Sequence, residues 1–67
     1  MDTTHLRIEG MSCAHCVRAI TDALEAVPSV REARVDLAGG TAEIDHDGVE
    51  RARLEDAVEE AGYRVAG

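Results

Sequence analysis

The first part of the chain contains two different spacings of hydrophobic residues. In residues 5–9 apolar and polar positions alternate, so Leu6 and Ile8 point to the same side, which predicts a half-buried strand. In residues 14–26 apolar positions recur every three or four residues, which predicts a helix. Pro28 ends this helix, because a proline disfavours helical backbone in the residue before it. The apolar stripe of the helix consists of Val17, Ile20, Leu24 and Val27.

Two further alternating runs surround a Gly-Gly pair. The first run covers residues 33–37, and the second begins directly after Gly39 and Gly40. Glycine adopts positive φ without steric cost, so this pair suits a tight hairpin turn between two strands. We expect the inward-facing side chains of these strands to be Ala33, Val35, Leu37, Ala42 and Ile44.

A second helical stripe precedes Gly62. Asp47 and Glu50 have the spacing of a capping box, and the alternative is that Glu50 itself begins the helix. Gly62 is expected to cap the C-terminal end of the helix. Residues 63–65 leave room only for a short edge strand. The stripe itself consists of Leu54, Ala57, Val58 and Ala61.

The order of these elements is strand, helix, strand, strand, helix, strand. Each helix must bury one stripe against a single sheet, which predicts an α+β, ferredoxin-like βαββαβ sandwich with two helices on one face of a four-stranded antiparallel sheet. We expect residues 1–67 to form a single domain. In this fold the loop after the first strand lies at one edge of the molecule, which places Cys13 and Cys16 near the surface.

Composition and charge narrow the functional class. A chain of 67 residues leaves little room for a deep catalytic cleft, so we expect a binding protein and not an enzyme. Seven arginines and no lysine against fourteen acidic residues give a formal charge of -7, which argues against binding to nucleic acids or anionic membranes. No secretion signal or long apolar run is present, so we expect a complete, cytoplasmic protein without membrane insertion.

The two cysteines are the residues best suited to chemistry. Cys13 and Cys16 lie at the start of the predicted helix, where unpaired backbone N–H groups favour thiolate over thiol. Two neighbouring thiolates repel each other unless a cation lies between them, and Cu(I) is a soft ion that suits such ligands. Zinc fits less well, because only His15 is at hand to add to the two sulfurs of a usually four-ligand site. A redox dithiol, as in a small thiol oxidoreductase, remains an alternative.

The motif "GMSCAHC" after a first strand, together with "AGY" before the last strand, resembles the heavy-metal-associated domain family. Within that family the chain is similar to bacterial and archaeal copper chaperones. The resemblance implies that Cys13 and Cys16 bind Cu(I) and pass it to the metal-binding domain of a copper-transporting P-type ATPase. It also implies a monomer without metal, with a copper-bridged dimer as an alternative. An excised N-terminal domain of such an ATPase, or a zinc or mercury carrier, would look similar.

Several residues around the cysteine motif have more than one interpretation. We expect Met11 to anchor the loop in the core and not to bind metal, because methionine fills irregular gaps well. Tyr63 is the only aromatic residue. The resemblance places it beside the metal loop, where its hydroxyl can lie near a thiolate, and core packing is the alternative. His15 is expected to face solvent.

The remaining expectations concern residues at the surface. His5 and His46 are predicted to be exposed. Arg18 and Arg64 follow the cysteine motif and Tyr63 closely, so they are candidates to steer a partner toward the metal loop. The alternative for Arg18 is an ordinary helix-surface ion pair with Asp22.

Overall fold

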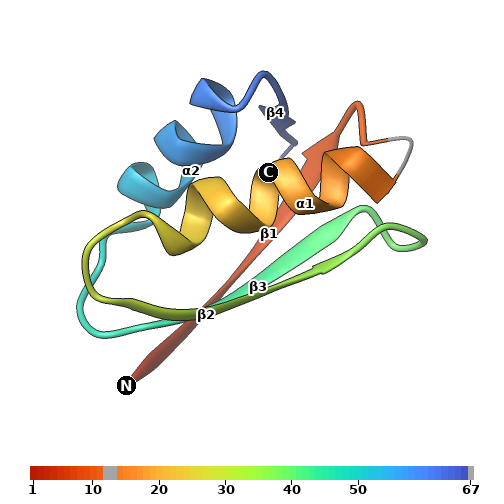
Figure 1. Ribbon diagram of the computed structural model, residues 1–67. Helices are drawn as coiled ribbons and strands as arrows, with labels where there is room; N and C mark the ends of the chain where they lie inside the picture. The colour runs from red at the N-terminus through yellow and green to blue at the C-terminus, as the bar shows by residue number, and fades with distance from the viewer. Residues whose placement is uncertain (12–13, 67) are drawn as a thin grey trace.

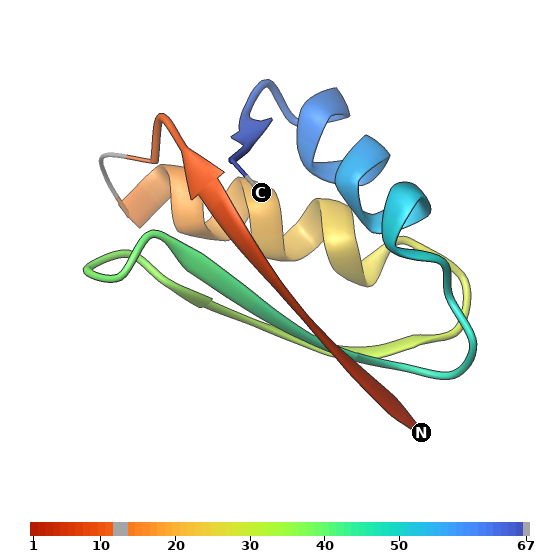
Figure 2. The same ribbon diagram turned by 180° about the vertical axis from the view of Figure 1, so that it is seen from behind.

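A computed structural model of the chain describes residues 1–11 and 14–66. Its elements follow the predicted order, and antiparallel pairing arranges the strands as β2-β3-β1-β4. Figures 1 and 2 show both helices on the same face of the sheet. The predicted ferredoxin-like fold is therefore confirmed. The bounds are β1 (Asp2–Glu9), α1 (Ala14–Glu25), β2 (Val30–Asp36), β3 (Thr41–His46), α2 (Arg51–Glu60) and β4 (Arg64–Val65).

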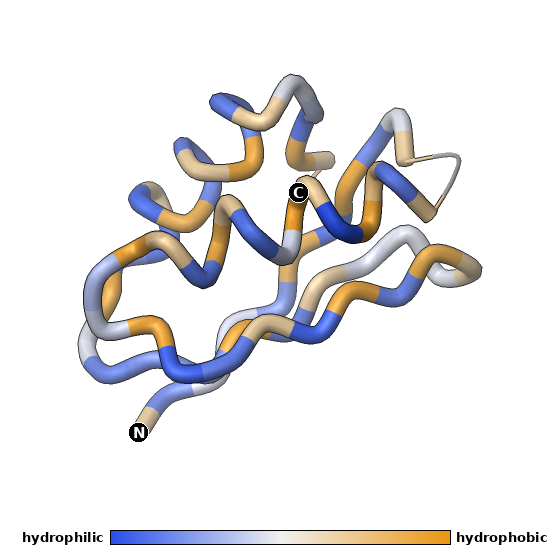
Figure 3. The backbone as a smooth tube through the Cα atoms, in the orientation of Figure 1, coloured by the Kyte–Doolittle hydropathy of each residue, from blue (hydrophilic) through white to orange (hydrophobic). Residues whose placement is uncertain are grey.

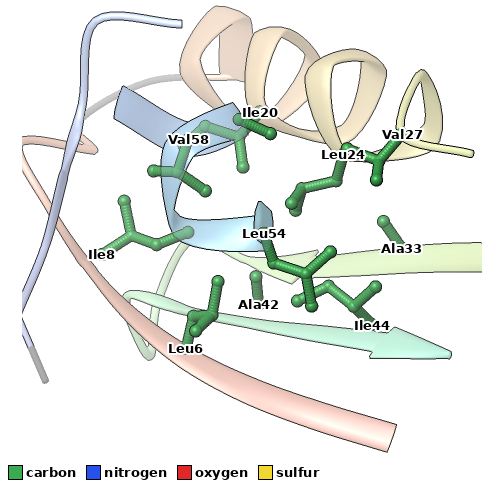
Figure 4. Packing of buried hydrophobic residues seen from close by; sticks show 11 residues of the cluster. Leu6, Ile8, Ile20, Leu24, Val27, Ala33, Ala42, Ile44, Leu54 and Val58 are labelled. Carbon is green, nitrogen blue, oxygen red and sulfur yellow. The ribbon is translucent and has the colours of Figure 1, made fainter. Parts of the chain in front are cut away.

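The core lies between the helices and the sheet, and it is aliphatic. The helical stripes and the alternating strand positions supply its side chains, which point toward one another in Figure 4. Figure 3 shows the same two periods along the backbone, with hydrophobic and hydrophilic segments alternating in the strands and recurring more slowly in the helices. The buried cluster consists of Leu6, Ile8, Ile20, Leu24, Val27, Ala33, Ala42, Ile44, Leu54, Ala57 and Val58.

Two sequence-based expectations at element ends were wrong. Leu37 was expected to point inward, but β2 ends at Asp36 and Leu37 lies in the following turn with 39% of its surface exposed. The turn closes through a hydrogen bond from the Gly40 N–H to the Leu37 carbonyl at 3.3 Å, with Gly40 at φ +64°. The capping box was also wrong, because Glu50 is the N-cap of α2 and no side chain caps that end.

Gly62 ends α2 as predicted. It adopts φ +97°, and its N–H donates to the Glu59 carbonyl at 3.0 Å. The Tyr63 N–H donates to the Val58 carbonyl at 3.3 Å, so this end of the helix forms a Schellman motif. The motif reverses the chain and sets Tyr63 directly before β4.

His46 was expected at the surface, but only 3% of it is exposed. The Val49 N–H donates to Nδ1 of His46 at 3.1 Å, so Nδ1 carries no proton. In the neutral ring Nε2 is then the donor, and it lies 2.7 Å from Oγ1 of Thr4. A histidine at the inward end of β3 is tolerated here because both of its ring nitrogens have partners.

The helix-free face of the sheet carries a network centred on Arg34 of β2. Its guanidinium donates to Glu43 at 2.9 Å from Nε, to Glu32 at 2.8 Å and to Asp45 at 3.0 Å. These hydrogen bonds hold the pKa values of Glu43 and Asp45 below their usual range, and they raise the pKa of Arg34. His5 contributes a further contact to Glu43 at 2.7 Å. The network joins three strands of the sheet.

This network predicts a specific loss of stability in acid. Because the pKa values of Glu43 and Asp45 are lower in the folded state, their contribution is complete above the ordinary carboxyl pKa of about 4 and is lost as the pH falls below it. In the Arg34→Gln variant, the free energy of unfolding should fall less between about pH 4 and pH 2 than in the wild type. Urea unfolding at a series of pH values measures this difference.

Arg53→Gln is the matched control, because Arg53 is exposed and makes no ion pair with any residue in the described part of the chain. Its acid profile should match that of the wild type. Parallel profiles for the wild type and Arg34→Gln would contradict the prediction.

Candidate metal-binding site

The cysteine motif lies between β1 and α1, at one end of the sandwich. Two other turns meet it there (Figure 1). The β2–β3 turn is held against the end of β1 by a 2.8 Å hydrogen bond from the Ile8 N–H to the Gly40 carbonyl. The α2–β4 turn approaches from the other side, since Glu9 pairs with Arg64. The motif is therefore supported on both sides by segments far away in the sequence.

Cys16 belongs to the first turn of α1, and only 8% of it is exposed. This turn contains backbone N–H groups that have no acceptor within the helix, and their partial positive charge favours a thiolate. Burial of Cys16 against a regular element restricts where its sulfur can lie. Cys13 and Ser12 fall outside the described residues, so the pairing of Cys13 with Cys16 stays a prediction.

The described residues before the motif hold its start firmly. Gly10 adopts φ +86°, a backbone conformation that favours glycine, and it turns the chain out of β1. Met11 is half-buried and packs against the core cluster. This packing agrees with the expected role of Met11 as an anchor of the loop.

Tyr63 lies beside the start of the motif. The Cδ1 atom of its ring is 4.0 Å from the position that a Cβ atom would take at Gly10. The ring also packs against the core, so its location near the loop and its role in packing are compatible. An open, polar hollow next to it is lined by Glu9, Gly10, Glu59, Gly62, Tyr63 and Arg64.

The opposite flank of the motif carries positive charge. Ala14, His15 and Arg18 line a small hollow on the exposed side of α1. The expected exposure of His15 is confirmed. The alternative pair of Arg18 with Asp22 does not form, and Arg18 makes no ion pair with any residue of 1–11 or 14–66. Its guanidinium is thus available to a partner.

No other metal site emerges from the part of the chain that the structure describes. Within it, no three or more His, Cys, Asp or Glu side chains are grouped so that they could hold a metal ion. The helices of the described residues are also too short and too polar to span a bilayer. The cysteine motif therefore remains the candidate site.

Comparisons with known proteins agree with this location. The family model of the heavy-metal-associated domain matches residues 5–64. The copper chaperone CopZ of Staphylococcus saprophyticus is 39% identical over 67 residues, which cover 97% of this chain and 98% of that protein. Copper-transporting ATPase 2 of Rhizobium meliloti is 44% identical over 62 residues, or 91% of this chain and 8% of that protein. A solved structure described as CopZ metallochaperone superposes with a TM-score of 0.93 at 36% identity, covering 97% of this chain and 100% of that one. The chain belongs to the heavy-metal-associated domain family.

Proposed function

We propose that this protein is a cytoplasmic copper chaperone that binds Cu(I) through the thiolates of Cys13 and Cys16. The observation that carries the proposal is the match to a copper chaperone over nearly the whole length of both proteins. As a member of this family the chain is a metal carrier and not an enzyme. Two closely spaced sulfurs suit Cu(I), which is soft and accepts few ligands.

The structure around Cys16 supports a site that holds its cargo and still releases it. Cys16 is fixed by α1 and buried, while the motif as a whole lies at an end of the molecule where a partner can approach (Figure 1). In our proposal a partner thiolate attacks the bound Cu(I) before either resident sulfur leaves. The ion then passes through three-sulfur intermediates and is never free in solution.

Two other assignments compete with the chaperone. A metal-binding domain of a copper-transporting ATPase would share this fold, as the similarity to the Rhizobium meliloti protein illustrates. A zinc or mercury carrier would share the cysteine pair, and a small thiol oxidoreductase would use the pair without metal. The first alternative differs in the molecule that carries the domain, and the others differ in chemistry that can be measured.

Anaerobic titration of the reduced protein with Cu(I), against a competing chelator, tests the proposal. We expect one tightly bound Cu(I) per monomer and weaker binding of Zn(II) and Hg(II) under the same competition. Sedimentation of the samples should show a monomer before copper is added, and a dimer afterwards would support the copper-bridged form. A clear acceleration of insulin reduction over small thiols would favour the oxidoreductase instead.

We also propose that the recipient is the metal-binding domain of a copper-transporting P-type ATPase, and that Arg18 steers it to the loop. The exposed guanidinium stands next to the motif in a protein with a formal charge of -7. Such a local charge raises the association rate more than the final affinity. In Arg18→Glu, copper transfer should slow at low salt and converge with the wild type at high salt. Stopped-flow transfer to a purified ATPase domain across a salt series measures both.

Arg53→Glu is the matched control for this experiment. It makes the same change of charge at an exposed site in α2, beside Val27 and Pro28 at the other end of α1. Transfer by this variant should depend on salt as the wild type does. Equal slowing by both variants would show that net charge matters and that Arg18 has no specific role.

A further inference from the structure

The charges of both helices are arranged against their dipoles. A helix stabilises acidic side chains in its first turn and basic side chains in its last turn. Neither α1 nor α2 has an acidic residue in the first turn or a basic residue in the last. Instead, α2 begins with Arg51 and Arg53 and ends with Glu59 and Glu60, and α1 ends with Glu25. At low ionic strength these charges oppose helix formation.

Most of the acidic side chains also lack a cationic partner. In the described part of the chain, arginine forms ion pairs only with Glu32, Glu43, Asp45 and Glu55. The other carboxylates of residues 1–11 and 14–66 make none. The formal charge of -7 is therefore carried on a body measuring only 29 × 20 × 17 Å.

These distances decide how much salt matters. The screening length is about 8 Å at physiological ionic strength and about 3 Å at 1 M salt. Many of the unpaired carboxylates therefore repel one another at low salt, and so do the helix ends and their acidic residues. Molar salt removes both effects, whereas the short hydrogen-bonded pairs of Arg34 change less.

We propose that the folded state of this protein depends on salt and is built for a compartment of high ionic strength. The carboxylates at the C-terminal ends of α1 and α2 are the main source of this dependence. Screening by monovalent salt relieves their repulsion in the folded state. The unfolded chain has no helix dipoles and keeps its charges further apart, so it gains less.

Thermal unfolding of the apo protein tests the proposal first. From about 0.1 M to about 2 M KCl, we expect the unfolding midpoint to rise by at least about 10 °C. KCl is used because sulfate salts stabilise proteins by exclusion from their surface. A sucrose series without added salt measures any general exclusion effect. A midpoint that stays constant or falls with KCl would overturn the proposal.

Two double variants with the same change of net charge locate the effect. Glu59→Gln with Glu60→Gln removes unpaired charges from the end of α2, so it should raise the midpoint at low salt and flatten its rise with KCl. Glu43→Gln with Glu55→Gln removes ion-paired charges, so it should lower the midpoint at low salt. Identical salt slopes for the two variants would show that only net charge counts and would overturn the role given to the helix ends.

Discussion

Replacement of Cys13 or Cys16 by serine is expected to abolish tight Cu(I) binding and to leave the fold intact. A hydroxyl oxygen is a hard, weak ligand for a soft ion, so a single sulfur would remain to hold the metal. The loss should exceed the roughly 10- to 100-fold reduction in affinity that follows removal of a group that only orients a ligand. Competition titration measures the affinity, and circular dichroism measures the fold.

The fold should survive because its core does not depend on metal. The buried cluster is made of aliphatic side chains from both helices and three strands. Cys16→Ser places a hydroxyl in a buried position and should cost about 1 to 3 kcal/mol of stability. Cys13→Ser has its own value as a test, because it carries the same prediction for copper from the other ligand.

His15→Ala is the matched control for the cysteine variants. It changes an exposed residue between the two cysteines, and we expect it to bind Cu(I) as the wild type does. Retention of tight binding after either cysteine replacement would refute the proposed ligand pair. Unfolding of the apo protein after either replacement would refute the view that the core is independent of the metal site.

His46→Ala is expected to destabilise the protein by about 2 to 4 kcal/mol. The substitution removes the contact with Thr4 and leaves the Val49 N–H without its acceptor. It also opens a void at the inward end of β3, where the imidazole is almost fully buried. Urea unfolding monitored by circular dichroism measures the change in the free energy of unfolding.

His5→Ala provides the comparison for His46→Ala. Its imidazole contacts Glu43, but the side chain is 68% exposed, so the loss should be at most about 1 kcal/mol. Copper affinity should be unchanged in both variants, since His46 lies at the end of β3 away from the cysteine motif (Figure 1). Equal destabilisation by the two substitutions would contradict the structural role assigned to His46.

The type and order of the elements could be predicted from the sequence because they depend on local periodicity. The spacing of Leu6 and Ile8 can only place both on one face of a strand, and the stripe of α1 can only face one side of a helix. Pro28 and Gly62 act on the backbone next to them, so the ends that they determine were also predictable. The cysteine motif is likewise readable, because its ligands are three residues apart.

Positions at the ends of strands were not predictable from periodicity. Leu37 continues the alternation of β2, but the chain has already turned, so the side chain is partly exposed. His46 continues the alternation of β3 and is buried, although its residue type favours the surface. The deciding contacts come from Thr4, forty-two positions away, and from the backbone of Val49. Local sequence carries no record of such partners.

The sequence by itself determined the two helices, the strands, the aliphatic core and the pair of candidate ligands, because each follows from residues close together in the chain. Only the tertiary structure decided what surrounds the candidate site: the ring of Tyr63 beside Gly10, and the β2–β3 turn tied to Ile8. It also decided that Arg34 has three acidic partners while Arg18 pairs with no described residue. These features join segments far apart in sequence, and which segments meet depends on how the whole sheet and its helices pack.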